Sequence, residues 1–162
     1  MSRTTVSSFK DLFCIEMGQS PKAEFVNIVG EGVPLLNGPA EFTSKHPIPK
    51  QFTTKGNRFS EALDILFCVR GSTTGRMNIA DQKYAIGRGL AAIRHREGNH
   101  LNAFVRGLIE QNLVGLLGGS MGSVFPNLTK DQLLNYKCVV PDLMEQHKIA
   151  EILSDLDAKI EV

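Results

Sequence analysis

The pattern of apolar and polar positions predicts a chain with more strand than helix. Short apolar runs separated by glycine, proline and polar residues are typical of strands joined by turns. The clearest run, Ile65–Val69, is continuous and rich in β-favouring residues, so it predicts a buried strand. His46–Pro49 is expected to be extended, because a residue before proline is pushed out of the helical region. The other predicted strands are Phe9–Met17, Val33–Leu36, Leu90–Ile93 and Cys138–Val140.

Helical spacing appears in three later stretches. After Gly98-Asn99, apolar residues recur at helical spacing until Gly118-Gly119 ends the pattern; they are Leu101, Phe104, Val105, Leu108, Leu113, Leu116 and Leu117. Thr129 and Gln132 match a capping box, which predicts one short helical turn. Pro141 is expected to begin the last helix, in which four apolar residues step by four, three and four as in a coiled coil: Ile149, Leu153, Leu156 and Ile160.

These elements predict an α+β fold. We expect a compact mixed-strand domain over residues 1–140 and the start of a coiled-coil-type spacer helix over residues 141–162. A length of 162 residues with 42% hydrophobic content allows one core. Because two heptads are too few to stand alone, the last helix is expected to pack on a partner, on a second copy or on its own domain.

Charge is unevenly distributed along the chain. The net charge of +1 argues against a protein that coats nucleic acid. However, residues 45–106 contain eleven Lys or Arg against four Asp or Glu, whereas residues 131–162 contain three against seven. A basic middle and an acidic tail indicate two surfaces with different partners, the alternative being an ordinary solvated exterior of mixed charge.

The cysteines and the absence of long apolar runs indicate a soluble, cytoplasmic protein. Cys14, Cys68 and Cys138 are odd in number and lie among apolar neighbours, so reduced, buried thiols are expected rather than disulfides or a zinc site. The sequence contains no run of 18 apolar residues and no basic-then-apolar leader.

No motif favours catalysis. Residues 87–92 match a dinucleotide-binding fingerprint, but they lead into a predicted strand rather than a helix. Asp142 and Asp157 are separated by fifteen residues of one predicted helix, roughly 22 Å, so they cannot share a metal ion. The four histidines have no ligand spacing, so a metal site is not expected.

Two polar loops suit binding. Arg70–Arg76 places two guanidinium groups around a segment of small polar residues, and such groups can reach phosphate oxygens or fork onto guanine. Gly118–Ser123 is a second small polar segment. The alternative is that both loops are connecting turns.

Several motifs together resemble one family. They are Asp64–Gly71, Gly75-Arg76, Ile86–Arg94, Ser123–Lys130, Pro141–Leu143, Glu145-Gln146 and Ile149–Leu153. From about Gly18 to the C-terminus, the chain resembles a target recognition domain of the DNA specificity subunit of type I restriction-modification systems. Leu63 stands where family members usually have glycine. Full-length subunits have two such domains and two spacer helices, so this chain resembles a half-subunit or a fragment.

The resemblance implies a non-catalytic, sequence-specific DNA-binding module. It would read one half of a bipartite target in double-stranded DNA and direct a separate methyltransferase subunit, and in restricting complexes a translocating nuclease, to that target. S-adenosylmethionine, ATP and Mg would belong to the partner subunits, so no cofactor is expected on this chain. A homodimer through the last helix is a further expectation. The alternative is an assembly protein that does not bind DNA and docks on the methyltransferase subunit.

The candidate residues form two groups. DNA contacts are expected from Arg70, Arg76, Arg88, Arg94 and Lys130, from the loop donors Ser72, Thr73, Ser120 and Ser123, and more weakly from Gln19, Ser20 and Lys45. Arg88 and Arg94 could equally support the fold by pairing with carboxylates. The expected partner-helix stripe is Met144, Ile149, Leu153, Leu156 and Ile160, with packing inside the domain as the alternative.

Overall fold

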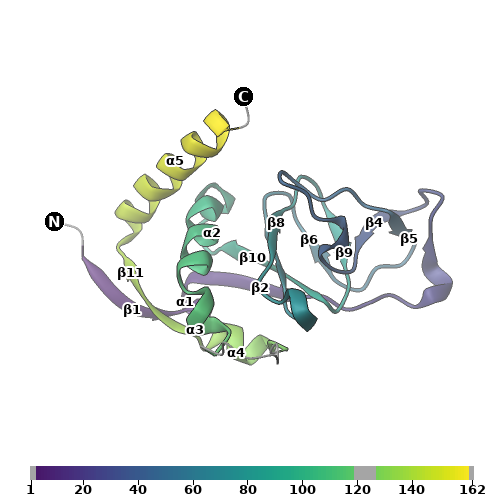
Figure 1. Cartoon of the computed structure of the whole chain (residues 1–162), viewed down its shortest axis with the longest axis horizontal. Coiled ribbons are helices and arrows are strands. Elements are labelled where there is room, and N and C mark those ends of the chain that lie inside the picture. Colours follow the sequence, from purple (N-terminus) through teal and green to yellow (C-terminus); the bar gives the residue numbers. More distant parts are fainter. Residues whose placement is uncertain (1–2, 119–126, 161–162) are drawn as a thin grey trace.

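The computed structural model of the chain describes residues 3–118 and 127–160. Figure 1 shows the α-helices gathered at one end of the molecule together with β1 (Thr4–Ser8) and β11 (Lys137–Pro141), and α5 (Leu143–Ile160) projecting toward the C-terminus. None of the helices in these two ranges is both long and apolar enough to span a bilayer.

The strands are β1 Thr4–Ser8, β2 Phe13–Met17, β3 Val26–Asn27, β4 Val33–Leu36, β5 Gln51–Thr53, β6 Phe59–Ser60, β7 Ile65–Cys68, β8 Met77–Ile79, β9 Tyr84–Ile86, β10 Leu90–His95 and β11 Lys137–Pro141. The remaining α-helices are α1 Phe9–Leu12, α2 Asn102–Gln111, α3 Leu113–Leu116 and α4 Lys130–Leu134. Single 3₁₀ turns cover Ala23–Phe25, Pro39–Glu41, Gly71–Thr73 and Asn99–Leu101.

A four-stranded antiparallel sheet, in the order β2-β10-β7-β8, lies at the centre. Its two middle strands are buried on both faces. Along β7, Ile65 and Phe67 enter the core beneath the helices, whereas Leu66 and Cys68 enter a second core on the opposite face. This alternation explains why the apolar run in β7 is continuous, since neither face meets water.

The second core is closed by a five-stranded sheet in the order β3-β5-β4-β9-β6. Leu36 of β4 and Ile86 of β9 are paired in parallel and both are fully buried. The layers are therefore helices, central sheet and second sheet, which confirms the expected α+β class.

The N-terminal elements differ from the prediction. Phe9–Met17 is not one strand, because Phe9–Leu12 forms a helical turn that puts Phe9 and Leu12 into the core before β2 begins. The polar segment Thr4–Ser8 forms β1, which the apolar pattern missed, and pairs with β11.

Two helix boundaries also differ. The helix expected up to residue 117 is interrupted at Asn112, whose side-chain amide donates to the Leu108 carbonyl (2.8 Å) and separates α2 from α3. The last helix begins at Leu143 rather than Pro141. Pro141 still belongs to β11, where it pairs with Thr4 of β1. Asp142 caps the helix, because its side chain accepts the Glu145 amide (2.9 Å). This amide is the main reason that the pKa of Asp142 is lowered.

The thiols follow the prediction in two of three cases. Cys68 and Cys138 are buried and free, and burial raises the pKa of Cys68 to about 12. Cys14 is free but exposed, because its side chain points to the outer face of β2, an edge strand of the central sheet.

Candidate nucleic-acid interface

Three loops meet at one end of the central sheet. The strand register places Met17 of β2 beside Ala91, Cys68 of β7 beside Leu90 of β10, and Met77 of β8 beside Phe67. The segments that leave or enter the strands at this end therefore lie together: residues 18–20, 69–76 and 87–89. We call these three segments the arginine edge, because they carry Arg70, Arg76 and Arg88.

Backbone hydrogen bonds join the segments of the arginine edge. The Gly18 amide donates to the Leu90 carbonyl (2.8 Å), and the Val69 amide donates to the Gly89 carbonyl (3.0 Å). The Leu128 amide then donates to the Val69 carbonyl (2.8 Å). The segment that leads into α4 is thus fixed to the same edge, and it brings exposed Lys130 as the first residue of α4.

Arg88 is held between two glycines that have no room for a side chain. A Cβ on Gly87 would lie 2.7 Å from Asn37 Oδ1 and 3.1 Å from Ser20 Oγ, and one on Gly89 would lie 2.5 Å from the Asn37 carbonyl oxygen. The Arg88 amide donates to Ser20 Oγ (3.2 Å). The backbone is therefore fixed while the Arg88 side chain remains exposed.

The turn between β7 and β8 is also fixed. The Gly75 amide donates to the Cys68 carbonyl (2.9 Å), and the Arg76 amide donates to the Thr73 carbonyl (3.0 Å). Gly71 and Gly75 have φ angles of 77° and 101°, which glycine adopts without strain. Arg70, Ser72 and Arg76 are exposed on this turn, and Thr73 is half-buried.

The arginines of the edge have no carboxylate partners in the described chain. Arg70, Arg76 and Arg88 take part in none of the ion pairs formed within residues 3–118 and 127–160. Exposed, unpaired guanidinium groups on a rigid backbone can bind phosphate oxygens or base edges.

Arg94 lies at the other end of the sheet and supports the fold. Its Nε and Nη2 donate to the two oxygens of the buried Asp64 carboxylate, at 2.8 and 2.7 Å. These hydrogen bonds are the main reason that the pKa of Arg94 is raised. Of the two roles that the sequence left open for Arg94, the structure favours pairing with a carboxylate, whereas Arg88 has no such pair within residues 3–118 and 127–160.

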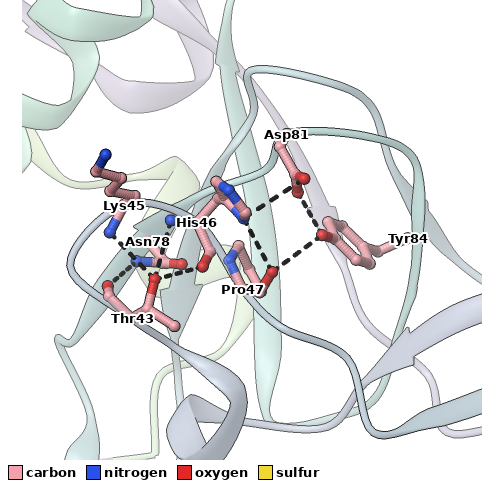
Figure 2. A network of polar contacts seen from close by, with 7 residues as sticks. All are labelled: Thr43, Lys45, His46, Pro47, Asn78, Asp81 and Tyr84. Carbon is pink, nitrogen blue, oxygen red and sulfur yellow. Dashed lines mark hydrogen bonds and ion pairs between the residues drawn. The ribbon is translucent and has the colours of Figure 1, made fainter. Parts of the chain in front are cut away.

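Lys45 also lies away from the arginine edge. Figure 2 shows its loop fixed to the β8–β9 connection by polar contacts. The Thr43 hydroxyl accepts the Lys45 amide (3.1 Å), Asn78 Nδ2 donates to the Thr43 carbonyl (2.7 Å), and the Tyr84 hydroxyl donates to Asp81. Burial is the main reason that the pKa of Tyr84 rises to about 12. Lys45 lines a cleft with Leu153 and Asp157 of α5, so it lies beside the helices.

The remaining predicted DNA contacts divide as follows. Gln19 and Ser20 are exposed and belong to the arginine edge, where the Gln19 amide donates to the Ile86 carbonyl (3.0 Å). Ser120 and Ser123 lie outside the described residues. Lys130 follows Thr129, whose capping box with Gln132 is confirmed.

Sequence reasoning missed Asn37, which lies against the Gly87–Gly89 segment, and Gln51, which Asn37 contacts. Asn37 follows β4, and Gln51 begins β5; Asn37 Nδ2 donates to Gln51 Oε1 (2.7 Å). The Asn37 backbone and side chain both touch the Gly87–Gly89 segment. The available signal was the pair of glycines around Arg88, which indicates that another part of the chain approaches closely.

Of the predicted partner-helix stripe on α5, some residues pack against the domain and others are exposed. Ile149 and Leu153 are half-buried against the domain, and Leu153 Cδ1 would lie 3.1 Å from a Cβ on Gly107 of α2. These two residues thus follow the alternative of packing inside the domain. Met144 and Leu156 are 71% and 49% exposed, and exposed Ile152 lies between them along the helix. The side chain of Ile160 lies outside the described residues.

Comparisons with known proteins identify the family of the chain. The family model for the type I restriction modification DNA specificity domain matches residues 1–162. The chain is 41% identical over 152 residues to the "Putative type I restriction enzyme MjaX specificity subunit" of Methanocaldococcus jannaschii; the match covers 93% of this chain and 35% of that protein.

Solved structures share the fold. The crystal structure of the HsdS subunit from Thermoanaerobacter tengcongensis has a TM-score of 0.76 and 28% identity, over 98% of this chain and 38% of that one. The type I restriction-modification S subunit from M. genitalium has a TM-score of 0.69 and 19% identity, over 99% and 40% of the two chains, and shows the fold alone. The chain thus spans little more than a third of the length of these relatives.

Proposed function

Because the chain belongs to the type I restriction-modification DNA specificity domain family, we propose that it is the sequence-specific DNA-binding module of such a system and works in the cytoplasm. In this role it reads one half of a bipartite target in double-stranded DNA. A second recognition domain would come from the rest of a longer protein or from a second copy.

The observation that carries this proposal is that Arg70, Arg76 and Arg88 are exposed on one rigid edge and form no ion pair with the residues that the structure describes. Phosphate contacts by arginine position a protein on a duplex, and amide or hydroxyl groups beside them supply base contacts. Gln19, Ser20, Ser72, Thr73 and Lys130 lie on or next to this edge and can supply such polar contacts.

Chemistry on the DNA belongs to other subunits in this proposal. S-adenosylmethionine, and in restricting complexes ATP and Mg, would be bound by a methyltransferase or translocase partner. The chain itself contributes target choice, for which binding and orientation of the duplex are sufficient.

The exposed side of α5 is the proposed contact with the methyltransferase subunit. Met144, Ile152 and Leu156 are separated by multiples of four residues, so they lie along one ridge of the helix. Ile149 and Leu153 hold the other side of α5 against α2. The helix can therefore keep its place on the domain while it offers an apolar ridge to a partner.

Selection of bound duplexes from a random pool tests the proposed function. The full chain, with and without the cognate methyltransferase subunit, is expected to enrich one short sequence. If no duplex is retained at 50 mM salt in either condition, the DNA-binding proposal is wrong. A chain that binds the methyltransferase subunit but no duplex would support the rival function, an assembly protein, which the apolar ridge of α5 and the near-neutral net charge favour.

A further inference from the structure

The Asn37–Gln51 hydrogen bond lies beside the Gly87–Gly89 segment that carries Arg88, and the DNA-binding proposal does not yet use it. Asn37 Oδ1 would lie 2.7 Å from a Cβ on Gly87, and the Asn37 carbonyl oxygen 2.5 Å from a Cβ on Gly89. The Gly87 amide donates to the carbonyl of Leu36, the residue before Asn37 (2.8 Å). Asn37 is therefore wedged against the segment that carries Arg88, and its position is fixed by backbone on both sides.

Asn37 in turn fixes the orientation of the Gln51 carboxamide. Asn37 Nδ2 donates to Gln51 Oε1 at 2.7 Å, so one lone pair of that oxygen is used and the amide plane cannot rotate freely. In the parts of the chain that the structure describes, Gln51 Nε2 has no hydrogen-bond partner. Gln51 thus presents one NH₂ donor and the second lone pair of Oε1 side by side, on a residue held in register opposite Leu35.

A donor and an acceptor side by side match one base edge in the major groove. Adenine offers N7 as an acceptor and N6–H₂ as a donor, and a glutamine carboxamide can bind both at once. A fixed carboxamide loses less side-chain entropy on binding than a free one, which favours the bidentate contact. Asn37 lies against Gly87 and Gly89, the two neighbours of Arg88 in the chain. If Arg88 binds a phosphate, the Asn37–Gln51 pair would therefore lie close to a groove of the same duplex.

We infer that Gln51 reads an adenine of the DNA target and that Asn37 is the positioning residue that orients it. This inference rests on the proposed DNA-binding function and assigns base choice to residues outside the arginine edge. The competing explanation is that the pair only stabilises the β4–β5 connection at the surface.

The test compares the sequences that four variants of the full chain select from a random duplex pool. In the wild-type motif, one position is expected to be A·T. Gln51→Ala is expected to lose the preference at that position alone, on the order of tenfold in relative affinity. Gln51→Glu is expected to prefer C·G there, because a carboxylate accepts from cytosine N4. Asn37→Ala is expected to weaken the same preference, and Gln111→Ala, an exposed glutamine on α2, should leave the motif unchanged.

The possible outcomes distinguish failure of the Gln51 inference from failure of the proposed DNA-binding function. If all variants select the wild-type motif, the inference is overturned and DNA binding stands, including the case in which Gln51→Ala only lowers the melting temperature. If the wild-type chain selects nothing, the proposed function and the inference both fail. A change confined to one base-pair position in both Gln51 variants, with circular dichroism showing that they are folded, supports the inference.

Discussion

Leu63 adopts a left-handed backbone conformation, with φ at 74°, and no other non-glycine residue of the described chain has a positive φ. Two hydrogen bonds hold it there: its amide donates to the Ala80 carbonyl (2.7 Å), and its carbonyl accepts from Asn102 Nδ2 (2.7 Å). The resemblance described under Sequence analysis predicts glycine at this position, and the left-handed backbone gives the physical reason. Leucine keeps the turn geometry at the cost of strain between its Cβ and the backbone.

Replacing this leucine by glycine is expected to stabilise the protein. Leu63→Gly should raise the free energy of unfolding by about 1 kcal/mol, because relief of the left-handed strain exceeds the entropy that glycine adds to the unfolded chain. Little burial is lost, since Leu63 is 47% exposed. Urea unfolding measures the change. Leu63→Ala keeps the Cβ and should show no gain, so an equal gain in both variants would argue against strain as the cause.

Among the helices and strands, the sequence correctly predicted those that depend only on the local pattern of apolar and polar residues. The strand at Ile65–Cys68 and the capping box at Thr129 were predicted correctly, because each depends on neighbours within a few residues. The Phe9–Met17 segment was misread, since its apolar residues serve a helical turn and a strand that face the same core. Polar Thr4–Ser8 forms a strand only because β11 offers it a partner from the other end of the chain.

Some residues of the candidate site could also be predicted from the local sequence, whereas others could not. Arg70, Arg76 and Arg88 could be picked from loop chemistry, because they flank apolar strands and glycine. The sequence could not show that Arg94 faces Asp64 across β7 and β10, or that Asn37 meets Gln51. Both contacts depend on strand order, which no local pattern records.

A buried histidine lies where α5 packs on the domain. His95 Nδ1 accepts the Glu97 amide (3.0 Å), so Nε2 carries the proton that it donates to Gln146 Oε1 (2.7 Å). Burial is the main reason that the pKa of His95 is lowered, while the nearby His100 and His147 lower it and Glu97 and Gln146 oppose the shift. Protonation of Nδ1 would remove the contact with the Glu97 amide and place a charge in this buried site, whereas the Nε2 contact with Gln146 would remain.

This contact predicts a loss of stability in acid. In the unfolded chain, histidine has a pKa of about 6.5. Below that pH the unfolded state binds a proton that the folded state does not, so the free energy of unfolding falls as the pH drops below about 6.5. Above that pH the contribution of neutral His95 to stability is fully present. Urea unfolding between pH 7.5 and 5.0 should show this fall. His95→Gln should show a smaller pH dependence, and an unchanged pH dependence would exclude His95 as the source.

For the whole molecule, the central basic segment does not form one continuous surface. Arg70, Arg76 and Arg88 lie at one end of the central sheet, with Lys130 brought to the same end by the hydrogen bond of Leu128 to Val69. Arg94 and Lys45 lie toward the opposite end and beside α5. The strand order therefore separates a basic edge for DNA from a helix that can meet a protein partner.

The salt dependence of duplex affinity tests this separation most directly. The selected duplex is titrated by fluorescence anisotropy at several salt concentrations with the wild-type chain, with Arg70→Ala, Arg76→Ala and Arg88→Ala combined, and with Lys159→Ala. Lys159 is a matched control because it lies near the end of α5, whose neighbouring residues Asp157 and Ala158 line a cleft with Leu63 and Ile65 at the opposite end of the sheet. We predict that the log–log slope becomes shallower by about 0.9 for each arginine that contacts a phosphate, and that Lys159→Ala leaves the slope unchanged. An unchanged slope and affinity in the combined arginine variant would contradict the account.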